Sequence, residues 1–232
     1  MHAYASEVER YINQFADPEA AKPMKAYMRN QFEYLGVSLW QVRKKIEEFY
    51  TLRGLPALDD LDEVIHDLWN IPYREFKYIA IDMLVRFINE LPGDFIETLE
   101  YLLTSQSWWD TVDSLAGEVV GAFFLRHPEL RDKTLKRWRS SDDLWLRRTC
   151  LIFQLKYKNT TDFELMKEII LENLGTKEFF IKKAIGWALR QYSRVDPVGV
   201  REFVDQSALS NLSRKEALKW IDKATKMEEK NQ

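Results

Sequence analysis

The sequence predicts an all-α protein, a right-handed solenoid of about six helix pairs with a concave basic groove. Three observations predict it: a composition that favours helix, a series of helix-start signals, and a repeat of about 35 residues. The 232 residues include only 8 Gly and 7 Pro, fewer than the turns of a sandwich or barrel need. A hydrophobic content of 46% and a charged content of 31% indicate a folded chain rather than a disordered one.

Helix-start signals occur along the whole chain. A serine followed three residues later by Gln or Glu forms a capping box, and an Asp before Pro places a cap before the first helical residue. The predicted starts are Asp17-Pro18, Ser38 with Gln41, Asp142 or Asp143, Thr176, Asp196-Pro197, and Ser213 with Glu216. We find no alternating strand pattern and no Asn-Gly or Asp-Gly hairpin turn. His127-Pro128 is expected at a helix end.

An internal repeat organises these helices. Residues 144–151 and 179–186 each read as three apolar or aromatic residues, two basic ones, then small and apolar ones. Steps of about 35 residues connect six anchors: Lys45, Ala80, Ser114, Thr149, Ala184 and Lys219. The period is shorter than the ~40–47 residues of HEAT units and near the ~34 of TPR units. TPR signature residues do not recur, so we predict short HEAT-like helix pairs forming a single domain over residues 1–232.

Equivalent positions of a solenoid line up along its groove. Asp113, Arg148 and Lys183 immediately precede three successive anchors. Trp109 comes one helical turn before Asp113, and Trp187 one turn after Lys183. We therefore expect these five side chains to face the same side. The neighbouring Trp108 cannot point the same way and is expected in the core.

This constellation suggests chemistry on a cation. An aromatic plane beside a carboxylate holds a cation or a developing positive charge. The alternatives are a solvated helix face or a structural ion pair between Asp113 and Arg148, with the tryptophans filling the core. Tyr27 is ambiguous and by composition belongs to the core.

The basic residues favour a nucleic-acid partner. The net charge of −3 hides a segregation, because residues 131–226 hold 21 Lys+Arg against 13 Asp+Glu, a net of +8. The pairs Arg147-Arg148 and Lys182-Lys183, together with Arg190, recur at repeat spacing. A solvated face explains any one pair, whereas a groove that follows a phosphate backbone explains several.

Other classes of function have little support. Cys150, the only cysteine, lies in an apolar run and is expected to be inert, and the 3 histidines are far apart without metal-ligand spacing. We find no glycine-rich phosphate loop, no signal peptide and no apolar run of about 18 residues. The expectation is a cytoplasmic protein without metal, cofactor or membrane segment.

The chain resembles the AlkD type of bacterial DNA alkylation repair enzymes, which are HEAT-like repeat DNA glycosylases. The likeness covers nearly the whole length and is densest in residues 107–113, 152–158 and 177–187. It implies excision of N7-alkylguanine and N3-alkyladenine from duplex DNA by a monomer. The resemblance places the catalytic aspartate at Asp113, lesion contacts at Trp109, Trp187 and Tyr27, and a DNA contact at Arg148. Further candidates for binding DNA phosphates are Lys183, Lys182, Arg147 and Arg190.

Two alternatives remain open at this stage. One is a non-catalytic HEAT-repeat protein that binds distorted DNA. The other is a protein–protein scaffold, a common role of helical solenoids.

Overall fold

The computed structural model describes residues 1–230, with side chains through residue 224. The described residues are helices and turns without a β-strand, and only an isolated bridge joins Glu33 and Tyr73. The prediction of an all-α, HEAT-like solenoid is confirmed. The described residues form two compact units, which divide between Leu102 and Leu103. A single domain over residues 1–232 stays a prediction.

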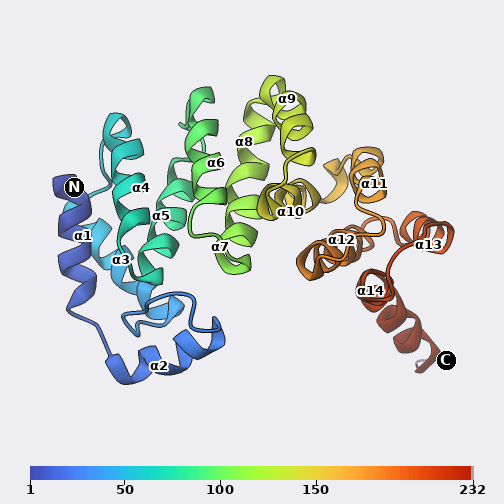
Figure 1. The fold of residues 1–232 in the computed structure, drawn as a ribbon, viewed down its shortest axis with the longest axis horizontal. Coiled ribbons are helices and arrows are strands. Elements are labelled where there is room, and N and C mark those ends of the chain that lie inside the picture. The colour runs from blue at the N-terminus through green and yellow to red at the C-terminus, as the bar shows by residue number, and fades with distance from the viewer. Residues whose placement is uncertain (231–232) are drawn as a thin grey trace. The chain divides into compact units, whose positions relative to one another are not determined.

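The first unit pairs its helices around α3 and α5. Helix α1 packs on α3 and α4, α3 packs on α5, and α4 packs on α5 (Figure 1). The helices are α1 (Ala3–Asn13), α2 (Pro18–Tyr27), α3 (Leu39–Arg53), α4 (Leu61–Asn70), α5 (Arg74–Phe87) and, at the boundary, α6 (Ile96–Thr104). Short 3₁₀ turns precede α4 and α6. Trp69 is completely buried in this unit.

The second unit contains a layer of four helices that pack in sequence. Helix α7 packs on α10, α10 on α12, and α12 on α14. The helices are α7 (Trp109–Ser114), α8 (Gly121–Arg126), α9 (Pro128–Arg139), α10 (Leu144–Ile152), α11 (Phe163–Glu172), α12 (Phe179–Tyr192), α13 (Pro197–Gln206) and α14 (Asn211–Lys230). A π-helical segment, Leu115–Val120, joins α7 to α8. The segment begins two residues after Asp113, and single π-helical turns inside α-helices often occur at functional sites.

The 35-residue repeat has a simple structural meaning. Each anchor lies in the second helix of a pair, and these second helices are α3, α5, α7, α10, α12 and α14. Equivalent residues of neighbouring helices therefore lie side by side wherever those helices pack. None of the helices in the described part of the chain is long and apolar enough to span a membrane.

Most of the predicted helix starts are confirmed. The side chains of Asp17, Asp143 and Asp196 cap α2, α10 and α13, and Ser38 with Gln41 forms the capping box of α3. His127 ends α8 and precedes α9, as expected.

Two predicted starts are wrong. Thr176 precedes α12 by three residues, and its hydroxyl instead accepts a hydrogen bond from the backbone N–H of Glu178. Ser213 lies inside α14, where the Ser210 hydroxyl accepts from its backbone N–H. The sequence pattern misled because Glu216, the supposed partner of Ser213, has a tertiary role.

Candidate active site

A buried ion pair forms the centre of the candidate site. Arg148, on α10, donates from Nε and Nη2 to the two carboxylate oxygens of Asp113, on α7, at 2.7 and 2.8 Å. Its Nη1 donates to the backbone carbonyl of Phe180, on α12. Arg148 is 4% exposed, whereas the Asp113 side chain keeps 17% of its surface exposed. The structure thus brings Asp113 and Arg148 together across one repeat and leaves the carboxylate as the more open of the two.

The environment raises the pKa of Asp113. Burial is the largest cause, and the negative charge of Asp110 adds to it. The hydrogen bonds and positive charge of Arg148 act in the opposite direction without cancelling the effect of burial. The carboxylate is therefore more basic than an ordinary aspartate while held in a fixed orientation.

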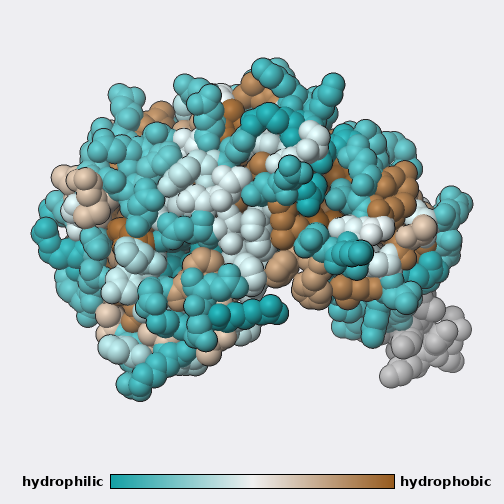
Figure 2. Space-filling model, in the orientation of Figure 1, coloured by the Kyte–Doolittle hydropathy of each residue, from teal (hydrophilic) through white to brown (hydrophobic). Residues whose placement is uncertain are grey.

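Three aromatic rings form a wall beside this pair. Trp108 lies 5.7 Å from Trp145 and 5.2 Å from Phe180, and Trp145 lies 5.1 Å from Phe180, between ring centroids. The Phe180 ring also faces the guanidinium of Arg148 at 5.9 Å. Figure 2 shows hydrophobic residues at the surface around α10 and α12. Sequence reasoning missed this cluster, although Trp145 and Phe180 are one repeat apart.

The tryptophans differ from expectation in one respect. Trp108 is half-buried rather than in the core, because it occupies the cap position before α7 and only its ring packs inward. Trp109 and Trp187 are also half-buried, so neither fills the core. Their role as lesion contacts stays a prediction.

Tyr27 does not belong to the core. It is the last residue of α2, and its side chain is 72% exposed. The chain turns directly after it through Arg29 and Asn30, which have φ values of 56° and 55° in the left-handed region. This position at a helix end explains why composition alone placed it wrongly.

Two cations of the predicted basic ladder, Lys183 and Arg190, share one carboxylate with Lys219. Glu216, on α14 and 3% exposed, accepts from Lys183 at 2.6 Å, from Lys219 at 2.8 Å and from Arg190. Burial raises its pKa, but the hydrogen bonds from Lys183 and Lys219 and the charge of Arg190 outweigh burial and lower it to about 2. Sequence reasoning did not anticipate this cluster, because Glu216 matched a capping box.

The basic candidates differ in their bonding partners and in their exposure to solvent. Arg147 donates to the backbone carbonyl of Ser141. Lys182 is half-buried and forms no ion pair with the described residues. The side chains of Lys183 and Arg190 stay 36% and 32% exposed despite their bonds to Glu216. DNA binding by these residues stays a prediction. The described residues contain no group of three His, Cys, Asp or Glu that could hold a metal.

Comparison with known proteins gives a consistent result. Residues 8–221 match the family described as DNA alkylation repair enzyme. The chain is also similar to the solved structure of a predicted DNA alkylation repair enzyme from Enterococcus faecalis, with a TM-score of 0.81 and 29% identity. That likeness covers 88% of this chain and 96% of the solved one. A comparison with curated proteins finds no match.

Proposed function

Because this chain belongs to the family of DNA alkylation repair enzymes, we propose that it is a monofunctional DNA glycosylase. Its substrates in this proposal are N7-alkylguanine and N3-alkyladenine in duplex DNA. The observation that carries the proposal is the Asp113 carboxylate, partly open to solvent and oriented by the bidentate contact with Arg148.

The chemistry of the lesion makes a single carboxylate sufficient. Alkylation at N7 or N3 leaves the base cationic and weakens the bond between the base nitrogen and C1′ of the sugar. When that bond breaks, its electron pair neutralises the departing base, so no acid is needed. The remaining requirements are to stabilise the oxocarbenium-like sugar and to deliver water to C1′.

Asp113 meets both requirements. A carboxylate has about four lone-pair sites, and Arg148 uses two of them, so the others can accept a hydrogen bond from water. The negative charge stabilises the developing positive charge on the sugar. The oxygen of water then bonds to C1′, and Asp113 accepts the proton that water releases. The raised pKa of Asp113 suits it to this role.

The other predicted residues bind the substrate. Trp109 and Trp187 hold the cationic nucleotide by cation–π and sugar contacts, worth roughly 0.5–2 kcal/mol each. Three of the five N–H donors of Arg148 are used, so two remain for a phosphate oxygen. Tyr27 is exposed at the end of α2, and its assignment as a lesion contact comes from the family resemblance alone. Lys183, Lys182, Arg147 and Arg190 bind the phosphate backbone.

Asp113→Asn tests this function. The variant keeps the shape of the side chain but removes its charge, so release of 7-methylguanine from duplex DNA should fall by about 100-fold or more. DNA affinity should change little. Asp110→Asn, which removes a charge from the same helix, is the control and should retain most of the activity. Excision by Asp113→Asn at the wild-type rate would rule out the proposed mechanism.

A non-catalytic DNA-binding protein is the second candidate. It is favoured by the engagement of both carboxylate oxygens of Asp113 by Arg148, as in a structural ion pair. Single-turnover assays on 7-methylguanine and 3-methyladenine DNA separate the two candidates. Binding without base release would support the non-catalytic protein.

A further inference from the structure

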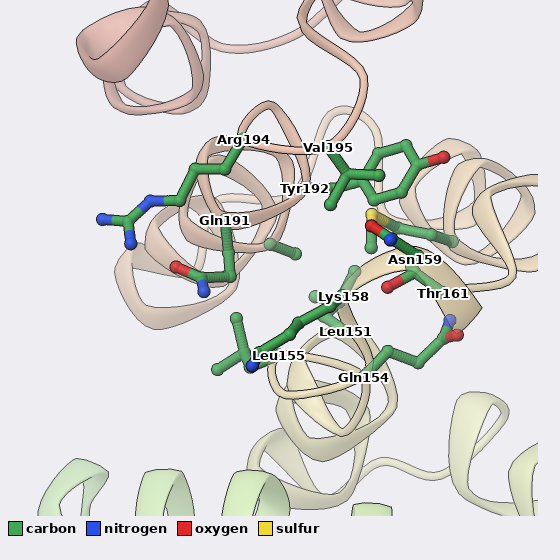
Figure 3. A pocket seen from close by; sticks show the side chains of 12 residues that line it. Leu151, Gln154, Leu155, Lys158, Asn159, Thr161, Gln191, Tyr192, Arg194 and Val195 are labelled. Carbon is green, nitrogen blue, oxygen red and sulfur yellow. The ribbon is translucent and has the colours of Figure 1, made fainter.

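A cleft with an apolar floor and a basic rim lies on the helices that carry the candidate site. It has a volume of about 290 Å³ and opens between the end of α10, the turn that follows it, and the end of α12 (Figure 3). Its floor is apolar and is formed by Leu151, Met166 and Ala188, all buried. The polar side chains around this floor include Lys158, Asn159, Thr161, Gln191 and Arg194.

The charge of this cleft is positive. Lys158 and Arg194 are exposed, and within the described residues neither forms an ion pair. Among the described residues that line the cleft, none is acidic. The hollow beside α9 and α11 differs in this respect, since it contains Asp132, Asp162 and Glu168 together with Arg131 and Arg139. While Arg148, Lys183 and Arg190 are bonded to carboxylates, Lys158 and Arg194 are available to an anion.

The turn that presents Lys158 is held firmly. The Gln154 side chain donates to the backbone carbonyl of Asp162 at 3.2 Å and accepts from its N–H at 2.8 Å, which closes the turn. The Tyr157 hydroxyl donates to the carbonyl of Gly121 at 2.7 Å. Lys158 itself has a φ of 54°, a conformation uncommon for a residue with a side chain. A cation on a pre-organised turn binds a ligand with a smaller entropic cost.

The cleft lies close to the candidate site along both helices. Leu151 comes one helical turn after Arg148 on α10, and Gln191 comes one turn after Trp187 on α12. One turn corresponds to about 5–6 Å. The charged side of the cleft lies further along, because Lys158 is ten residues after Arg148 and Arg194 is seven residues after Trp187. A strand of DNA whose lesion faced Asp113 would therefore bring a nucleotide beyond the lesion to the cleft.

We propose that this cleft binds one sugar–phosphate unit of the DNA strand beside the lesion. The phosphate lies between Lys158 and Arg194, with Gln191 donating to it, and the apolar edge of the deoxyribose rests against Leu155 and Val195. Ligand pockets usually start at about 300 Å³, so this volume suits a single nucleotide unit rather than a larger molecule. The inference rests on the proposed function for the identity of the partner.

Salt-dependent DNA binding provides the test. Lys158→Ala and Arg194→Ala should each weaken binding to a duplex with a 7-methylguanine, by about fivefold at low salt, and the double variant by more. The slope of log affinity against log salt should decrease in magnitude by about 0.9 for each phosphate that a variant no longer neutralises. Fluorescence anisotropy from about 50 to 300 mM KCl, a range in which phosphate contacts weaken, measures both quantities.

Lysines of another helix supply the control. Lys133→Ala and Lys136→Ala remove exposed charges from α9 and should leave the slope nearly unchanged. If these variants reduce the slope as much as Lys158→Ala and Arg194→Ala do, general electrostatics is responsible and the proposal is overturned. Equal melting temperatures would show that all variants are folded.

Two further measurements distinguish the cleft from the catalytic function and from a free ligand. The protein concentration that gives half-maximal single-turnover excision of 7-methylguanine should rise in Lys158→Ala by the same factor by which its DNA affinity falls, whereas Lys133→Ala should leave it unchanged. Absence of excision by the wild type would contradict the proposed function but leave the slope result standing.

Gln191→Glu, which adds a carboxylate, should weaken DNA binding. If instead a deoxynucleoside monophosphate binds the cleft and the DNA slopes do not change, the occupant is a free nucleotide and the proposal fails.

Discussion

Asp113 and Arg148 form a structural ion pair that also has a catalytic role in the proposed function. Arg148 is almost fully buried and connects three helices through Asp113 and the carbonyl of Phe180. Burial raises the pKa of Asp113, and the guanidinium limits that rise. Arg148 therefore acts first as a positioning residue, and any contact with DNA uses the N–H donors that remain.

Arg148→Ala should affect both the pH profile and stability. Without the guanidinium, the pKa of Asp113 rises further, because burial is no longer opposed. Since the proposed mechanism uses the ionised form of Asp113, single-turnover excision should decline at a higher pH than in the wild type as the solution is acidified. An unpaired buried charge also lowers the free energy of unfolding, by about 3–5 kcal/mol. Lys177→Ala, which removes an exposed charge, is the control and should change neither the pH at which excision declines nor the free energy of unfolding. If excision by Arg148→Ala declined at the same pH as in the wild type, Arg148 would not be a positioning residue for Asp113.

At the level of elements, the contact between α12 and α14 organises the basic residues. Gly186 allows the two helices to approach closely, because a Cβ atom there would lie 2.4 Å from Cβ of Glu216 and 2.8 Å from the Ser213 carbonyl oxygen. This approach brings Glu216 to Lys183 and Arg190. The packing of two helices thus decides where those cations point.

Gly186→Ala should destabilise the protein although alanine favours helix by about 1 kcal/mol. The added methyl group must push α14 away, which costs about 1–3 kcal/mol or more. Gly117→Ala is a suitable control, since a Cβ atom there meets only Leu155 Cδ1, at 4.0 Å. Urea unfolding should give a lower midpoint for Gly186→Ala than for the wild type, and a midpoint at or above the wild-type value would show that α14 is not tightly seated.

For the whole molecule, the distribution of charge matters more than its sum. The chain has a net charge of −3, yet residues 131–226 carry a net of +8, from 21 basic and 13 acidic residues. Many of these cations form ion pairs with acidic side chains, such as Lys156 with Glu118 and Arg139 with Glu172. The cations left unpaired then determine how strongly the surface attracts a phosphate backbone.

We therefore expect duplex DNA to bind despite the net negative charge. Counterion release makes log affinity fall linearly with log salt, by about 0.9 per phosphate neutralised. A salt titration of an undamaged duplex measures the slope without requiring catalysis. A chain that bound no DNA at low salt would instead match the protein–protein scaffold.

Most of the helix starts, the repeat period and the register of Asp113 with Arg148 could be predicted from the sequence. Those features depend on local caps and on a repeat in which equivalent residues must meet, so they can be counted along the chain. Only the tertiary structure revealed Glu216 as the partner of Lys183 and Arg190, the ring contacts of Trp108, and the cleft at Lys158. These contacts depend on how closely helices approach and on which side chains are shielded from water, and a linear pattern does not record either.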